Sequence, residues 1–450
     1  MSKIKENRHD KRAVQAVLQT VQEKRICFLQ LWFTDVLGFL KGITLPATEL
    51  PRVLESGLSF DGSSIEGFAR IEESDMVLAP EPATFAMLPW PIQGERAGRM
   101  FCNVTTPAGE PFPGDPRQVL KRCLKKAAAQ GFRCCIGAEM EFFFFRSRKA
   151  AEPLDSAGYF DLTPVATAEV VRHEIIGALE KLGIPIEYSH HEVSQSQHEV
   201  DLRYCDALQM ADNVVTFKFV ARQIAQAHDI HASFMPKPVF GINGSGMHMH
   251  LSLFRGGGNA FYDPKAPMHL SDIARHFIAG LLKFAPEFTA VTNQWVNSYK
   301  RLVPGFEAPV YLSWAQMNRS ALVRVPAFDP KRKNAARVEY RAPDVACNPY
   351  LAFAVLIAAG LEGISQRLKL APATSDNIFR MTEEERLAAG IKCLPKDLSE
   401  AIRLAEGSRL VRETLGDELF RFFIRNKRLE WDEYKAQVTD YEIRRYLPVL

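Results

Sequence analysis

The alternation of polar and apolar side chains over residues 247–253 predicts a β-strand with two different faces. His248, His250 and Ser252 fall on one face, while methionines and leucines occupy the other. A glycine-rich turn, Asn243-Gly244-Ser245-Gly246, comes directly before this strand, and backbone amides in such a turn can approach a ligand closely. The pattern therefore predicts a buried strand with one face equipped for chemistry.

Periodic apolar positions near the N-terminus predict a small unit rich in strands. Residues 11–23 have the spacing of an amphipathic helix, and residues 25–32 and 40–45 have the alternation of two strands. Residues 104–115 are rich in Thr, Pro and Gly and lack apolar periodicity, which is typical of a connection. Since 450 residues exceed what one hydrophobic core usually serves, we expect two domains, over residues 1–107 and 108–450.

The second domain is predicted to combine helices with strands. Several of its segments have helical spacing and alternate with strands that carry polar faces. The helical segments are residues 116–130, 167–182, 211–228, 348–368, 398–406 and 409–426. We therefore expect a larger α/β domain built on a curved sheet, and an α+β chain as a whole.

Charge and composition argue against several classes of partner. The 56 Lys and Arg residues nearly balance the 53 Asp and Glu residues, and a net charge of +3 gives no reason to expect nucleic acid or a membrane. No signal-peptide core follows Met1, and no stretch reaches about 18 uninterrupted apolar residues. The eight cysteines lack paired Cys-x-x-Cys spacing, which indicates reduced thiols rather than zinc. These features predict a cytoplasmic protein.

Two glutamates separated by one residue mark the first candidate site. Glu139 and Glu141 would project from the same face of a strand, and four phenylalanines follow at residues 142–145. Two like charges beside so much apolar surface are costly unless a cation compensates them. The alternative interpretation is an exposed acidic edge of the protein.

Three further glutamates extend this set. Glu192 and Glu199 lie in one polar segment, and Glu339 lies between Arg337 and Arg341. Together with His248 they make five glutamates and one histidine, and such oxygen-rich ligation suits Mg²⁺ or Mn²⁺ better than zinc. A single histidine is more often structural than a ligand, but the combination favours two to three bound metal ions.

Arginines accompany a loop bounded by proline and glycine. Residues 297–309 carry Glu307 near the loop tip, and Arg319 and Arg324 follow. Arginine suits the recognition of carboxylate and phosphate groups because its guanidinium forms bidentate hydrogen bonds. For any one of these arginines alone, a solvated basic surface is the alternative.

The order and spacing of these segments resemble those of type I glutamine synthetases, especially the alpha branch of bacterial and archaeal enzymes. The segment 237–252 is similar to the ATP-binding signature of that family, and the resemblance covers almost the whole chain. It implies an N-terminal β-grasp domain, and a C-terminal catalytic α/β domain whose curved antiparallel sheet forms an active-site funnel. It also implies a dodecamer of two hexameric rings with each site between neighbouring subunits.

The implied reaction is the ATP-dependent ligation of ammonia to L-glutamate through γ-glutamyl phosphate. The implied metal ligands are Glu141, Glu192 and Glu199 in one site and Glu139, His248 and Glu339 in the other. The implied glutamate-binding residues are Asn243, Gly244, Arg301, Arg319 and Arg341. The residues implied at the nucleotide are His250 and Ser252, with Arg324 and Arg337 near its phosphates.

The ammonium pocket implied by the resemblance combines two subunits. The neighbouring subunit would supply Asp61 and Ser64, and the pocket would add Tyr159, Glu192 and Glu307. Asp61 would accept a proton from ammonium, while Glu307 would close its loop against water and accept a proton from the tetrahedral adduct.

Some positions depart from the family pattern or bear on regulation. Ser196 replaces a glycine that is usual there, and residues 327–336 lack the usual Ser-Arg-Gly pattern of the alpha branch. Phe379 stands where the beta branch carries an adenylylated tyrosine, so adenylylation is not expected. Arg70 matches the alpha-branch arginine implicated in feedback inhibition by glutamine. The resemblance also allows small nitrogen-regulatory proteins as partners.

Two alternative functions remain open from the sequence. One is a ligase that joins glutamate to a polyamine, ethanolamine or methylamine, and the other is a catalytically silent family member. The presence of Asp61, Tyr159 and Glu307 favours ammonia, and the complete set of metal carboxylates favours an active enzyme.

Overall fold

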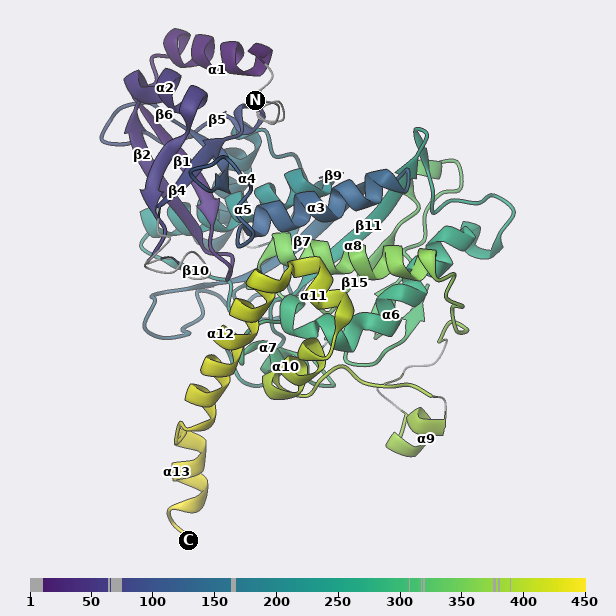
Figure 1. Ribbon diagram of the computed structural model, residues 1–450. Helices are drawn as coiled ribbons and strands as arrows, with labels where there is room; N and C mark the ends of the chain where they lie inside the picture. Colours follow the sequence, from purple (N-terminus) through teal and green to yellow (C-terminus); the bar gives the residue numbers. More distant parts are fainter. Residues whose placement is uncertain are drawn as a thin grey trace.

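The computed structural model describes residues 11–63, 65, 75–162, 167–306, 308–316, 318, 320–374, 378, 381–388 and 390–450. A small N-terminal unit of strands and helices sits beside a larger unit, and the last two helices project away from the body (Figure 1). The fold class is α+β, as predicted from the sequence. None of the helices in the described ranges combines the length and apolarity that a membrane crossing needs.

The N-terminal unit is a mixed sheet with two helices. Its sheet has the strand order β2-β1-β6-β4-β3, with β5 on β6, and β1 pairs with β6 in parallel. The predicted helix over residues 11–23 is confirmed, whereas the first strand begins at Phe28 rather than Arg25. The elements are α1 (Lys11–Glu23), β1 (Phe28–Thr34), β2 (Leu40–Pro46), α2 (Leu50–Ser56), β3 (Leu58–Asp61), β4 (Asp75–Pro80), β5 (Ala86–Met87) and β6 (Ala97–Thr105).

The larger unit is built on a sheet with the strand order β13-β14-β15-β11-β7-β9-β8, with β10 on β7 and β12 on β11. The described pairs are antiparallel, as expected, except that β13 and β14 pair in parallel. Its strands are β7 (Arg133–Phe145), β8 (Ile186–His191), β9 (Gln197–Asp206), β10 (His231–Ser233), β11 (Met247–Arg255), β12 (Gly258–Asn259), β13 (Trp314–Ala315), β14 (Val323–Arg324) and β15 (Val338–Tyr340).

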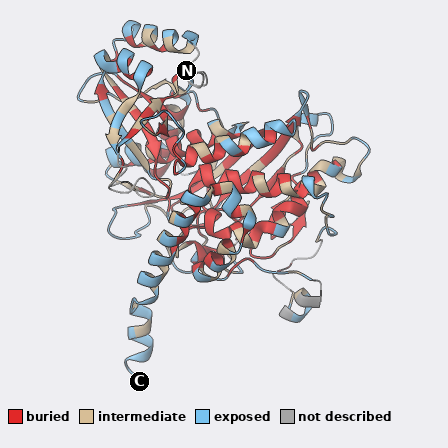
Figure 2. Ribbon diagram, viewed as in Figure 1, coloured by how far each residue is buried: buried red, intermediate tan, exposed pale blue. Residues whose placement is uncertain are grey.

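Helices bury this sheet in a common core, which Figure 2 shows as a continuous buried interior. Buried side chains of the helices α3, α5, α6 and α8 join those of β7, β9 and β11. The helices of the larger unit are α3 (Pro116–Ala129), α4 (Thr167–Lys181), α5 (Ala207–Ala227), α6 (Asp272–Thr292), α7 (Ser298–Arg301), α8 (Pro349–Ser365), α9 (Glu383–Ala388), α10 (Leu398–Glu406), α11 (Arg409–Leu415), α12 (Asp417–Lys435) and α13 (Asp440–Tyr446).

The predicted helix over residues 409–426 is wrong in one respect. The segment forms two helices, α11 and α12, because Gly416 between them has a φ of 84°, a left-handed conformation that glycine adopts without strain. None of the eight cysteines, all of which lie in the described part of the chain, is paired in a disulfide.

Glycines allow α6 and α8 to pack backbone against backbone. A Cβ atom at Gly363 would overlap the carbonyl oxygen of His276, and one at Gly280 would overlap that of Ala359. We expect Gly363→Ala to lower the free energy of unfolding by about 1–3 kcal/mol, because two rigid helices would have to separate. Gly177→Ala in α4 is the matched control, since its Cβ would meet no atom within 4 Å and alanine favours helix by about 1 kcal/mol.

Thermal melts of the two variants would test this packing. The melting temperature of Gly363→Ala should fall below that of the unmodified chain, while Gly177→Ala should melt at the same temperature or higher. Equal melting temperatures for the two variants would contradict a steric role of the glycine contact.

Candidate functional site

The register of the large sheet aligns the candidate ligands. Strand β7 lies between β11 and β9, and this pairing sets His248 opposite Glu139 and Glu199 opposite Glu141. On the other side of β11, His250 is opposite Glu339 of β15. Because alternate residues of a strand share a face, these side chains converge on one side of the sheet.

One group of side chains could hold a metal ion at the centre of this face. Ligand atoms of Glu139, His248 and Glu339 lie within 4.8 Å of one another. His248 Nδ1 is 2.7 Å from a carboxylate oxygen of Glu139. The fully buried carboxylate of Glu339 also accepts hydrogen bonds from Arg324 and Arg341.

A second group lies next to the first. Glu192 and Glu199 cluster with His190, and His248 Nε2 is 3.7 Å from Glu141. Glu141 is predicted from the sequence as a ligand together with Glu192 and Glu199, whereas His190 is not. His190 lies on β8 opposite Glu199 of β9, and its Nε2 is 3.1 Å from a carboxylate oxygen of Glu192. Local sequence patterns do not specify such a pairing of strands.

The electrostatics of the two groups differ. Burial, with the nearby charges of Asp201 and Glu141, raises the pKa of Glu199 well above its usual value, and burial also raises the pKa of Glu141. Burial acts in the same direction on Glu139, but His250 and His248 outweigh it and hold the pKa of Glu139 well below its usual range. Around Glu199 and Glu141, therefore, neighbouring positive charge does not outweigh burial and the repulsion between carboxylates.

This donor set fits a hard divalent cation. It consists mainly of buried carboxylate oxygens with imidazole nitrogens and without thiolates, which favours Mg²⁺ or Mn²⁺. A cation beside Glu199 would offset both the burial and the repulsion between carboxylates that raise its pKa.

Two cavities meet at these carboxylates. The first has a volume of about 570 Å³ and the second about 740 Å³, and Glu139, Tyr188 and Arg324 line both. The first is also lined by Tyr159, Asn243, Gly244, Arg301 and Arg341, besides the carboxylates of the second group. The second is also lined by Gly137, His250, Ser252, Phe328 and Arg337. The described residues predicted for glutamate thus line the first cavity, and those predicted for the nucleotide line the adjoining second cavity, with Arg324 lining both.

The arginines at the cavities are fixed by the backbone and by acids. Arg301 is 3% exposed, and its guanidinium donates to the carbonyl oxygens of Ala342 and Pro343. Arg337 donates to His250 Nδ1 at 3.2 Å, so it is held at the edge of the second cavity. Such fixed guanidinium groups could bind anions without a large loss of side-chain entropy.

Asp61 is a described predicted residue that one chain does not bring to these cavities. Asp61 is exposed at the end of β3, accepts a hydrogen bond from the Ser63 amide, and is not among the described residues that line either cavity. Four predicted residues lie outside the described part of the chain, as does Phe379: they are Ser64, Arg70, Glu307 and Arg319.

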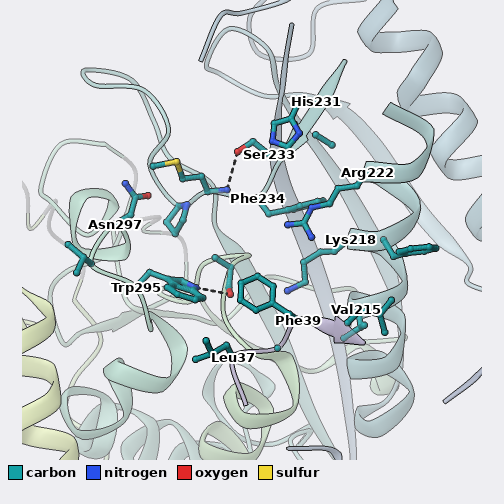
Figure 3. A pocket seen from close by; sticks show the side chains of 18 of the residues that line it. Leu37, Phe39, Val215, Lys218, Arg222, His231, Ser233, Phe234, Trp295 and Asn297 are labelled. Carbon is teal, nitrogen blue, oxygen red and sulfur yellow. Dashed lines mark hydrogen bonds between the residues drawn. The ribbon is translucent and has the colours of Figure 1, made fainter. Parts of the chain in front are cut away.

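A third cavity, of about 690 Å³, lies between the Leu37–Phe39 region and helix α5 (Figure 3). Its walls are largely aromatic and aliphatic, and the buried Lys218 amine donates to the carbonyl oxygens of Val345 and Cys347. Glu430 is the one acidic residue among its described lining residues. Because it lacks a carboxylate cluster, this cavity is not the candidate active site.

Comparisons with known proteins agree with this geometry. Residues 25–107 match the family model described as the glutamine synthetase beta-grasp domain, and residues 113–446 match the glutamine synthetase catalytic domain. The chain is 51% identical to a glutamine synthetase of Mycolicibacterium smegmatis, covering 96% of this chain and 98% of the relative. It is also 51% identical to a glutamine synthetase of Methanosarcina mazei, with 96% and 97% covered.

A solved structure described as a GmaS/ADP complex is also similar. It has 32% sequence identity and a TM-score of 0.87, and the match covers 96% of this chain and 99% of that chain. The expected domain types, a β-grasp domain followed by a catalytic domain on a curled sheet, are confirmed by these matches.

Proposed function

Because this chain belongs to the glutamine synthetase family, we infer that it catalyses the ATP-dependent ligation of ammonia to L-glutamate, which gives L-glutamine, ADP and phosphate. The observation that carries this inference is the buried carboxylate cluster between two adjoining cavities. One cavity carries arginines suited to an amino-acid carboxylate, and the other carries groups suited to a nucleotide.

The cofactor is a divalent metal, and we propose two to three Mg²⁺ or Mn²⁺ ions per subunit. The proposed ligands are Glu139, His248 and Glu339 in one site and Glu141, Glu192 and Glu199 in the other. Bound there, the ions would neutralise phosphate charge during phosphoryl transfer. The antiparallel register of β7, β9, β11 and β15 supports this assignment because it fixes the ligands before any ion binds.

The proposed first step transfers the γ-phosphoryl group of ATP to the glutamate side chain. Glutamate would lie in the first cavity, bound by Asn243, Gly244, Arg301, Arg319 and Arg341, and the nucleotide in the second, near His250, Ser252, Arg324 and Arg337. Arg324 lines both cavities, so it is suited to stabilise the charge that passes between them. The similarity to a protein solved as an ADP complex supports nucleotide binding by this chain.

The proposed second step is attack of ammonia on γ-glutamyl phosphate. The ammonium pocket would combine Tyr159 and Glu192 with Glu307, and with Asp61 and Ser64 of a neighbouring subunit. A carboxylate near ammonium stabilises the cation and can then accept its proton. The exposure of Asp61 within one chain supports its use by another chain.

We also propose that the chain belongs to the alpha branch of type I enzymes and that glutamine inhibits it through Arg70. The chain would form a cytoplasmic dodecamer of two hexameric rings, and its two domains would meet between residues 107 and 108. The two matched family regions, residues 25–107 and 113–446, support the position of that boundary. Interaction with small nitrogen-regulatory proteins remains part of the proposal.

A panel of amines would test the reaction. With ATP, glutamate and Mg²⁺, we expect glutamine and phosphate to form with ammonium much faster than any product forms with methylamine, ethanolamine or a polyamine. A pocket that holds a small cation between a tyrosine and carboxylates offers little space for a longer amine. Reactions without ATP are the control, and faster turnover with a larger amine would refute ammonia as the substrate.

A further inference from the structure

The segment between β8 and β9, residues 192–196, connects two candidate metal ligands, Glu192 and Glu199. We call it the serine turn because Ser194 and Ser196 are both buried there, at 5% and 0% exposure. Each hydroxyl accepts backbone amide hydrogens from a different part of the chain. Strands β8 and β9 with the turn between them form a hairpin that carries Glu192 and Glu199, and we call it the metal-ligand hairpin. The two serines therefore join this hairpin to two other segments that line the first cavity.

Ser196 binds the segment that carries Tyr159. Its hydroxyl accepts hydrogen bonds from the amides of Leu154, at 2.6 Å, and Asp155, at 3.1 Å. In return, the Ser196 amide donates to the Asp155 carboxylate at 2.9 Å. The same carboxylate oxygen is 3.0 Å from His191 Nε2 at the end of β8.

The backbone of Ser196 is strained, so part of the free energy gained from these hydrogen bonds is offset by an unfavourable backbone conformation. Its φ is 58°, in the left-handed region that residues other than glycine rarely adopt. Such a conformation persists when the surrounding structure over-determines it. Here the hydroxyl and the amide of Ser196 both bind the segment at Leu154 and Asp155, a contact that glycine could make only in part.

Ser194 binds the opposite wall of the same cavity. Its hydroxyl accepts a hydrogen bond from the amide of Asn243 at 3.0 Å. Gln197, the first residue of β9, reinforces this connection, since its side chain donates to the Gly244 carbonyl oxygen at 3.0 Å and to Glu141 at 3.2 Å. The glycine-rich turn and the metal-ligand hairpin are thus held in fixed relation.

We propose that Ser196 and Ser194 are positioning residues with separate effects, Ser196 setting the amine side of the active site through Tyr159 and Ser194 setting the glutamate side through Asn243. This inference rests on the proposed function, because Tyr159 and Asn243 were assigned to ammonium and glutamate there. Neither serine is among the described residues that line the two adjoining cavities, so each acts through the segment that it holds.

Steady-state kinetics of matched variants test the separation. Ser196→Ala and Ser196→Gly both remove the hydroxyl that accepts from Leu154 and Asp155. Both should raise KM for ammonium about three- to tenfold, on the scale of a lost neutral hydrogen bond, with KM for glutamate within about twofold. Ser194→Ala should raise KM for glutamate by a similar factor and leave KM for ammonium nearly unchanged, whereas Ser194→Thr should restore it.

The pair at Ser196 separates strain from hydrogen bonding. Glycine relieves the left-handed strain and alanine retains it, so the glycine variant should have the higher melting temperature while both share the KM effect. If both KM values changed together, or only the melting temperature changed, the serines would be merely structural and the proposal would be overturned.

Hydrogen exchange of the full-length protein gives a readout that needs no turnover. The amides of Leu154 and Asp155 should exchange faster in Ser196→Ala, and the amide of Asn243 should exchange faster in Ser194→Ala. Unchanged exchange at these amides would overturn the proposal. If wild-type protein failed to form glutamine while these exchange effects appeared, the proposed function would be wrong and the role of the turn in positioning both segments would stand.

Discussion

Glu339→Ala is expected to abolish glutamine formation while leaving most of the fold intact. Glu339 is fully buried, and Arg341 and Arg324 both bind its carboxylate. Burial alone would raise the pKa of Glu339, but the positive charges of Arg341 and His250 outweigh burial. The net effect is a pKa below the usual value, so the carboxylate is charged at neutral pH. Removal of this carboxylate would leave the proposed metal site without one of its three ligands. It would also leave two arginines without the anion that they share.

The expected loss of kcat exceeds about 100-fold, because even the partners of metal ligands typically contribute 10–100-fold. Glu339→Gln is the second variant, since it keeps the volume and part of the hydrogen bonding while it removes the charge. Glu139→Ala should behave in the same way, because Glu139 belongs to the same group. Glu180→Ala, at an exposed position at the end of α4, is the control and should retain activity.

A metal-binding measurement separates loss of the site from loss of the fold. Titration with Mn²⁺ should show fewer or weaker sites in Glu339→Gln than in the unmodified chain, while circular dichroism spectra of the two proteins remain similar. If either variant at Glu339 kept near-normal activity at ordinary metal concentrations, Glu339 would not be a metal ligand.

The chemistry of the site could be predicted because it depends on local periodicity. The alternation over residues 247–253 correctly places His248 and His250 on one face of β11, and the spacing of Glu139 and Glu141 places both on one face of β7. The pairing of strands could not be predicted in this way. The contact of β7 with β9 joins Glu141 to Glu199 across a long sequence separation, and local patterns do not specify such a register.

The strained backbone conformation of Ser196 could not be predicted from the periodicity of the sequence either. Ser196 has a left-handed conformation, and its hydroxyl accepts from the amides of Leu154 and Asp155, which are distant in sequence and lie beside it where β7 pairs with β9. The break at Gly416 is different, since glycine commonly ends a helix. Its position between two apolar repeats is therefore a sequence signal for two helices. The sequence resemblance supplied roles for Asp61 and Glu307 that no pattern within the chain implies.

Asp61→Ala is expected to spare the binding of ATP and glutamate but to strongly impair the use of ammonium. Within one chain, Asp61 lies at the end of β3 in the N-terminal unit, whereas the candidate metal ligands belong to the large sheet. A neighbouring subunit can supply this carboxylate if the ring places β3 over the first cavity. The ammonium ion would then lose a negative partner and a proton acceptor in the variant.

Mixing two inactive proteins tests whether the site is shared between subunits. When Asp61→Ala and Glu339→Ala proteins exchange subunits, some interfaces pair an intact Asp61 with an intact Glu339. In randomly mixed rings from equal amounts, roughly a quarter of the sites should be complete, because each site in a head-to-tail ring takes one residue from each neighbour. Partial activity should therefore return. The control mixes Asp61→Ala with the double variant, which cannot form a complete site, and mixed rings confirmed by mass spectrometry that stay wholly inactive would show that Asp61 acts elsewhere.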